Sequence, residues 1–257
     1  FNFLKSIYFL KNKEYQKALV ELNKIDSSDN LFFELRNVLK FWIEIEKNKY
    51  SNKILIKNFR SSNSGITLIN KFLASKYIND NELQFLYNQE ILNSNDFIRY
   101  KILLAWNKAI DNQKDYSLKI LQSALSQNNQ NILLKQTYKD FKNRNYNITS
   151  FFNSKLINHN LSEIFYLFSN LYQQRRDILF SNILLSIALD FNKNFLSNNL
   201  LRFENSLINN PKHNFNYLFL NKLKNIGDEY EWYINYNLAR HTKKQDINNL
   251  EILLNPK

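Results

Sequence analysis

Glycine and proline are scarce in this chain. Among its 257 residues the glycines are Gly65 and Gly227, and the prolines are Pro211 and Pro256. A mostly β protein of this length needs many turns, which use glycine for positive φ and proline for a preset φ. Antiparallel helices joined by short loops need few of either residue. The composition therefore predicts an all-α fold.

The spacing of apolar residues agrees with this prediction and is clearest between Leu161 and Phe191. Apolar side chains recur there at intervals of three and four residues, which places them along one face of a helix. The stretch predicts two amphipathic helices joined by a short polar turn, and most of the chain resembles loose copies of this hairpin. We expect about fifteen helices, stacked on their neighbours because a single hairpin buries too little apolar surface.

The hairpins resemble tetratricopeptide repeats (TPRs), which span about 34 residues and carry aromatic, large and small residues at fixed places. In the central hairpin those places are held by Phe165, Phe168, Ser169, Tyr172, Ser181, Leu185 and Ala188. Two other hairpins carry part of the pattern, through Ser6, Phe9, Tyr15, Ala18 and Leu22, and through Leu104, Ala105, Ser117, Leu121 and Ala124. Lys13 and Arg176 stand where the repeat has a turn glycine. The resemblance implies a right-handed α-solenoid of stacked helical hairpins.

Three segments are similar to a poorly characterised family of alphaproteobacterial TPR proteins: DFIRY at 96–100, SEIFYLFSNL at 162–171 and EWYINYNLAR at 231–240. Members of that family often begin with an export signal and continue past the point where this chain stops. The resemblance therefore implies a binding or scaffolding protein, truncated here at both ends. It also implies a periplasmic location, with the cytoplasm as the alternative.

The chain divides by pattern into three regions. Residues 1–60 are expected to form degenerate TPR-like hairpins, residues 61–95 an irregular helical region of the same solenoid, and residues 96–257 a continuous TPR-like solenoid. The segment RSSNSG at 60–65 is the best candidate for a loop. No apolar run approaches the roughly 18 residues needed to span a bilayer.

The sequence contains no catalytic, metal-binding or cofactor-binding signature. Its two glycines lie too far apart to form a phosphate-binding loop, and it contains no cysteine. The histidines, His159, His213 and His241, fall in different hairpins and lack a second histidine one helical turn away, as helical metal sites need. We therefore expect no enzyme, no cofactor, no metal and no small-molecule substrate.

The net charge of +12 raises the alternative of a nucleic-acid-binding protein. Eight of the 35 basic residues are Arg, the residue that makes bidentate phosphate and base contacts. Lys, Asn, Ile, Phe and Tyr are abundant, and all of them are encoded by A/T-rich codons. Codon bias is therefore a second explanation for the charge, and the two explanations stay open.

In tetratricopeptide solenoids the first helices of successive hairpins line a concave groove that binds a peptide or a helix. Transferred to this sequence, the groove positions are Tyr166, Asn170 and Gln173 in the central hairpin and Ile102 and Trp106 in an earlier one. The alternative for Trp106 is packing against a neighbouring helix. The alternative for Asn170 and Gln173 is a solvated helix face.

The leading hypothesis is a non-catalytic protein–protein interaction scaffold that holds a peptide, a helix or a partner domain in its concave face. The second is a helical-repeat protein that binds the RNA or DNA backbone. The third is self-assembly, which would show as a size that depends on concentration. The abundance of Lys and Asn mildly favours an acidic partner.

Overall fold

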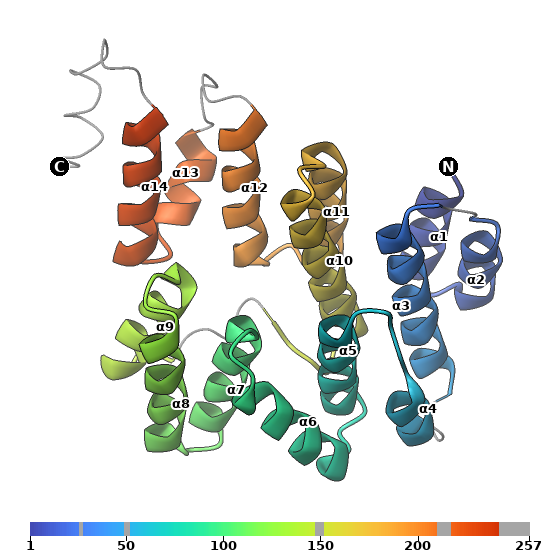
Figure 1. The fold of residues 1–257 in the computed structure, drawn as a ribbon, viewed down its shortest axis with the longest axis horizontal. Helices are drawn as coiled ribbons and strands as arrows, with labels where there is room; N and C mark the ends of the chain where they lie inside the picture. Colours follow the sequence, from blue (N-terminus) through green and yellow to red (C-terminus); the bar gives the residue numbers. More distant parts are fainter. Residues whose placement is uncertain (26–27, 49–51, 147–151, 210–216, 242–257) are drawn as a thin grey trace. The chain divides into compact units, whose positions relative to one another are not determined.

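The computed structural model describes residues 1–25, 28–48, 52–146, 152–209 and 217–241 (Figure 1). Helices are the regular secondary structure throughout these residues, with no strand among them, which confirms the all-α prediction. Pro211 and His213 lie outside the described residues, as do residues 242–257 at the end of the region expected to be solenoid. The helices are α1 (Asn2–Lys11), α2 (Tyr15–Asn23), α3 (Asn30–Lys47), α4 (Asn52–Asn58), α5 (Ser64–Tyr77), α6 (Asn81–Asn93), α7 (Ile98–Ile110), α8 (Lys114–Gln127), α9 (Ile132–Lys142), α10 (Ile157–Gln174), α11 (Ile178–Phe191), α12 (Leu196–Asn209), α13 (Tyr217–Lys224) and α14 (Asp228–His241).

Four helices begin at a constant interval. Helices α3, α5, α7 and α9 start at residues 30, 64, 98 and 132, so the successive intervals are equal. Three of the four are capped by a polar side chain that accepts a hydrogen bond from the first turn, namely Asp29, Asn63 and Asn131. The fourth cap is Phe97, whose side chain accepts no such bond. The equal spacing is therefore a property of where the helices start, and it does not depend on one type of capping residue.

Five helix ends share one backbone conformation, in which the second residue after the helix has a positive φ of 57° to 65°. In each case the next N–H bonds to the carbonyl five residues earlier, as Glu14 does to Phe9 and Gln113 does to Lys108, both at 2.8 Å. This is the Schellman motif, which normally places glycine at the left-handed position. The left-handed residues here are Lys13, Asn79, Asn112, Arg144 and Arg176. Lys13 and Arg176 are the two residues that replace a turn glycine in the TPR pattern.

The described chain divides into two compact units, each made of three stretches. Unit 1 comprises Phe1–Ser94, Phe152–Leu171 and Ile183–Lys193, and unit 2 comprises Asn95–Phe151, Tyr172–Asn182 and Asn194–Lys257. Within unit 1, the Trp42 Nε1–H of α3 donates to Asn70 Oδ1 of α5 at 2.8 Å in a buried contact. Within unit 2, helices α12, α13 and α14 share an apolar core that consists of Phe203, Leu207, Leu220, Leu223, Ile234 and Leu238.

Each unit also contains contacts between helices far apart in the sequence. In unit 1, Lys11 of α1 forms an ion pair with Asp190 of α11. In unit 2, α9 packs against α14, and Gln136 Oε1 accepts the Glu229 N–H at 3.1 Å. An array in which each repeat touches only its neighbours has no such contacts. Each unit therefore combines hairpin stacking with long-range helix packing.

Across the described helices, none has the combination of length and apolar character that crossing a membrane requires.

Candidate functional site

A row of hydrogen-bonded polar side chains crosses three helices of unit 2. Glu204 of α12 lies between Tyr233 of α14 and Gln173 at the end of α10. The Tyr233 hydroxyl donates to Glu204 Oε1 at 2.9 Å, and the Gln173 amide donates to the same carboxylate. Tyr233 also packs against the apolar core of α12–α14, which fixes the position of its ring. The row is thus supported by a packed core.

Partial burial determines the electrostatics of this row, since Gln173, Glu204 and Tyr233 are all half-buried. Burial raises the pKa of the Glu204 carboxyl above its ordinary value of 4.5, and the hydrogen bonds from Tyr233 and Gln173 oppose that rise. Burial and the charge of Glu204 raise the pKa of Tyr233, so its hydroxyl stays protonated and keeps donating. Both donors are neutral, and in the described part of the chain Glu204 forms no ion pair. A carboxylate held in this way favours an approaching cation.

Comparable bonds join three helices of unit 1. Glu46 of α3 accepts hydrogen bonds from Tyr77 of α5 and from Tyr15 of α2. Burial and the Glu46 charge raise the pKa of Tyr15 to about 12. The tyrosine lies 31 residues after the glutamate in the Glu46–Tyr77 bond and 29 residues after it in the Glu204–Tyr233 bond. In each unit, therefore, a Tyr–Glu bond connects helices that begin about one repeat apart.

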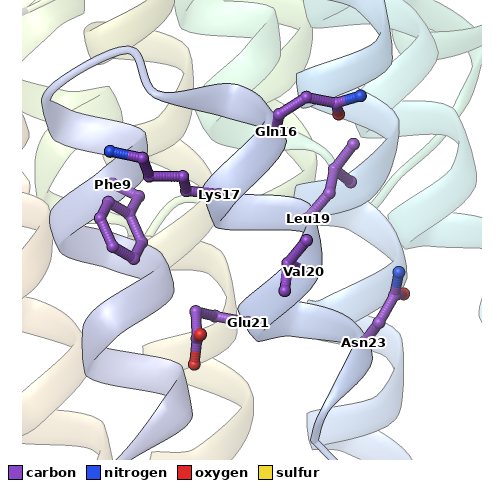
Figure 2. A pocket seen from close by; sticks show the side chains of 7 residues that line it. All are labelled: Phe9, Gln16, Lys17, Leu19, Val20, Glu21 and Asn23. Carbon is purple, nitrogen blue, oxygen red and sulfur yellow. The ribbon is translucent and has the colours of Figure 1, made fainter.

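Helices α1 and α2 form an open groove of about 570 Å³ on unit 1 (Figure 2). Phe9 of α1 forms one wall, and Lys17 and Glu21 extend from α2 toward it, above and below the ring in this view. Val20 lies at the centre of the α2 face. The full lining consists of Phe9, Gln16, Lys17, Leu19, Val20, Glu21 and Asn23.

The predicted groove residues of the central hairpin lie in both units. Tyr166 and Asn170 belong to unit 1 and are half-buried, and the Asn170 amide donates to the Tyr166 carbonyl of its own helix at 2.8 Å. Gln173 belongs to unit 2, where it takes part in the Glu204 row. Of these three residues, Gln173 is the one that the structure brings together with other polar groups of the candidate site.

The two predicted residues of α7 are buried. Ile102 is 2% exposed and Trp106 is 8% exposed, and the Trp106 Nε1–H has no acceptor among the described residues. Residues Tyr100 to Trp106 are buried without interruption, so α7 is covered on nearly every side. This placement leaves little of either side chain for a partner and matches the packing alternative stated for Trp106.

Sequence reasoning missed Glu204 and Tyr233. Glu204 directly follows the buried Phe203, and no neighbouring carboxylate or histidine marks it in the sequence. Glu204 is recognised by its contacts in the folded chain, because its partners Gln173 and Tyr233 lie about 30 residues away on either side in the sequence. Within the described residues, His, Asp and Glu side chains nowhere gather in a group of three that could hold a metal ion.

No protein-family model, curated protein or solved structure matches this chain. Its function is therefore inferred from the geometry of the chain itself.

Proposed function

We propose that this protein is a non-catalytic interaction scaffold, in which TPR-like hairpins of a right-handed α-solenoid bind a peptide, a helix or a domain of a partner protein. The constant interval between the starts of α3, α5, α7 and α9 supports the TPR-like repeat. It equals the length of a tetratricopeptide unit, which is about 34 residues. The contacts between distant helices make each unit more compact than a simple linear stack.

The observation that carries the proposal is the row of Gln173, Glu204 and Tyr233. Removing a carboxylate from water is unfavourable unless the group is paired, and the two donors of Glu204 are neutral. A residue that lowers the stability of the free chain in this way is typical of a binding surface. The row therefore offers a partner a fixed negative charge flanked by hydrogen-bonding groups, so we expect a basic side chain to occupy it. This differs from the acidic partner that the composition alone favoured.

The nucleic-acid alternative rests on the net charge of +12. Several surface lysines are already paired with carboxylates of the chain, including Lys17 with Glu14, Lys24 with Glu21 and Lys47 with Glu44. Phosphate binding would have to compete with these pairs, and it would weaken steeply as salt rises. The row on unit 2 centres on an anion, which repels phosphate.

A divided pull-down tests the proposal. The full chain is used as bait in an extract of its source cells at physiological salt, and half of the extract is treated with nuclease. We expect a discrete protein that survives nuclease and binds the Glu204→Gln variant about tenfold more weakly. Glu44→Gln, which removes a surface carboxylate on α3, serves as the matched control and should bind like the wild type. Loss of every partner with nuclease would establish the nucleic-acid alternative instead.

A further inference from the structure

The hairpin of α1 and α2 carries several exposed apolar side chains. Val20 at the centre of the groove is 53% exposed, and Tyr8 on α1 is 62% exposed. Tyr8 packs edge to face against Phe9, with ring centroids 5.6 Å apart. The apolar surface therefore continues along α1 beyond the wall of the groove that Phe9 forms. Exposed apolar surface of this kind commonly marks an interaction site.

The polar residues around Val20 have an order that is complementary to itself. Along the lining of α2, an amide residue stands at each end, at Gln16 and Asn23, and a cation and an anion stand inside them, at Lys17 and Glu21. Lys17 and Glu21 are four residues apart, so they lie on the same flank of the helix. If a second α2 helix is laid antiparallel across the first, each Lys17 faces the Glu21 of the other helix, each Gln16 faces Asn23, and the apolar centres meet.

Glu21 supplies a second, independent observation. Its residue is 8% exposed, and its Oε1 pairs with Lys24 at 2.6 Å. Its Oε2 is buried and has no hydrogen-bond partner in the described structure. Buried carboxylate oxygens are normally satisfied, so this oxygen indicates a donor that the single chain lacks. An ammonium group entering beside Phe9 provides that donor.

We propose that the α1–α2 groove binds the α2 helix of a second copy of this chain, in an antiparallel arrangement with two-fold symmetry. Such an interface uses the same patch on both copies, so it needs a patch that is complementary to itself. Val20 and Leu19 form its apolar centre. Two equivalent Lys17–Glu21 pairs fix its register, and each forms as Lys17 exchanges its exposed contact with Glu14 of its own helix for Glu21 of the other copy. The partner is therefore another copy of the protein, independent of the molecule that occupies the row on unit 2.

Sedimentation velocity of the full chain over a range of concentrations tests this proposal. The wild type is expected to shift from one copy to two as its concentration rises. Lys17→Glu and Glu21→Lys each place like charges opposite one another, so each is expected to weaken association about tenfold or more. The double variant Lys17→Glu/Glu21→Lys restores both attractive pairs and is expected to recover association. This recovery distinguishes a specific two-fold interface from simple charge screening.

Two matched variants control for charge and exposed apolar area. Lys53→Glu reverses a charge in an exposed ion pair on α4, and it should leave association unchanged. Val20→Lys should abolish association, whereas Ile54→Lys, at a position on α4 that is 67% exposed, should not. Circular dichroism checks that each variant is folded. A wild type that stays at one copy at every concentration overturns the proposal, as does a double variant that associates no better than the two single variants.

Discussion

At the scale of single residues, Gly227 is a position where the structure leaves no room for a side chain. Its φ is +155°, a conformation that other residues rarely adopt, and an added Cβ would overlap the side-chain amide of Gln136. Gln136 cannot simply move aside, because its amide donates to Asp140 and its Oε1 accepts the Glu229 N–H. We expect Gly227→Ala to lower the free energy of unfolding by about 2 kcal/mol, measured by urea denaturation.

The other glycine provides the control for that measurement. Gly65 lies in the first turn of α5, and its φ is not positive. Gly65→Ala is expected to leave stability unchanged or to raise it by up to about 1 kcal/mol, since alanine favours helix. Equal losses at both positions would contradict the role assigned to the backbone at Gly227.

Glu204 gives a prediction about pH. Because burial raises its pKa in the folded state, the folded chain holds the Glu204 proton more tightly than the unfolded chain does. This contribution to stability is present at low pH and is lost as the pH rises from the ordinary glutamate value of 4.5 through the raised value. Glu204→Gln removes the titration, so the variant should gain stability relative to wild type as pH rises through this window.

Thermal melts of both proteins across that pH range provide the measurement. Tyr233→Phe should have the opposite effect, because it removes a hydrogen bond that lowers the pKa of Glu204. A stability difference between wild type and Glu204→Gln that does not vary with pH would show that the carboxyl does not titrate abnormally.

At the scale of helices and turns, the residues with a left-handed backbone conformation give a test of turn stability. Lys13 has a φ of 59°, which costs a residue with a side chain about 1 kcal/mol relative to glycine. Lys13→Gly should therefore stabilise the chain by about 0.5–1 kcal/mol. Asn12→Gly is the neighbouring control, because Asn12 has an ordinary φ of −84° and glycine there only adds freedom to the unfolded chain. Urea denaturation should give opposite signs for the two variants.

The sequence predicts the helices of this fold better than it predicts the repeat boundaries and the turns. Apolar spacing predicted helices correctly, including the pair between Leu161 and Phe191 that corresponds to α10 and α11. The constant interval between helix starts is hard to recognise in the sequence, because the caps that mark it include a phenylalanine, Phe97, among three polar residues. The turns are equally hard to recognise, because lysine, arginine and asparagine occupy the place where glycine is the usual signal.

The candidate site was harder to predict for a different reason. Transferring groove positions assumes that each helix has one exposed face, and α7 is buried on nearly all sides, which hides Ile102 and Trp106. On α10 the transferred positions include Gln173, and its hydrogen-bond partner Glu204 lies one hairpin later in the sequence, where the transfer names no residue. A polar contact between distant residues leaves no periodic signal, so only the folded chain reveals the row.

At the scale of the folded unit, the packing of α9 on α14 predicts how unit 2 opens. In a stack where each repeat contacts only its neighbours, weakening α9 should leave α14 unaffected, because some 90 residues of sequence separate Gln136 from Glu229. Here Gln136 supports the start of α14, so Gln136→Ala should speed amide hydrogen exchange in both helices. Lys142→Ala, at the exposed end of α9, is the control and should change neither. Faster exchange confined to residues 132–142 would mean that the two helices open separately, and that stacking along the sequence alone determines the cooperativity of this unit.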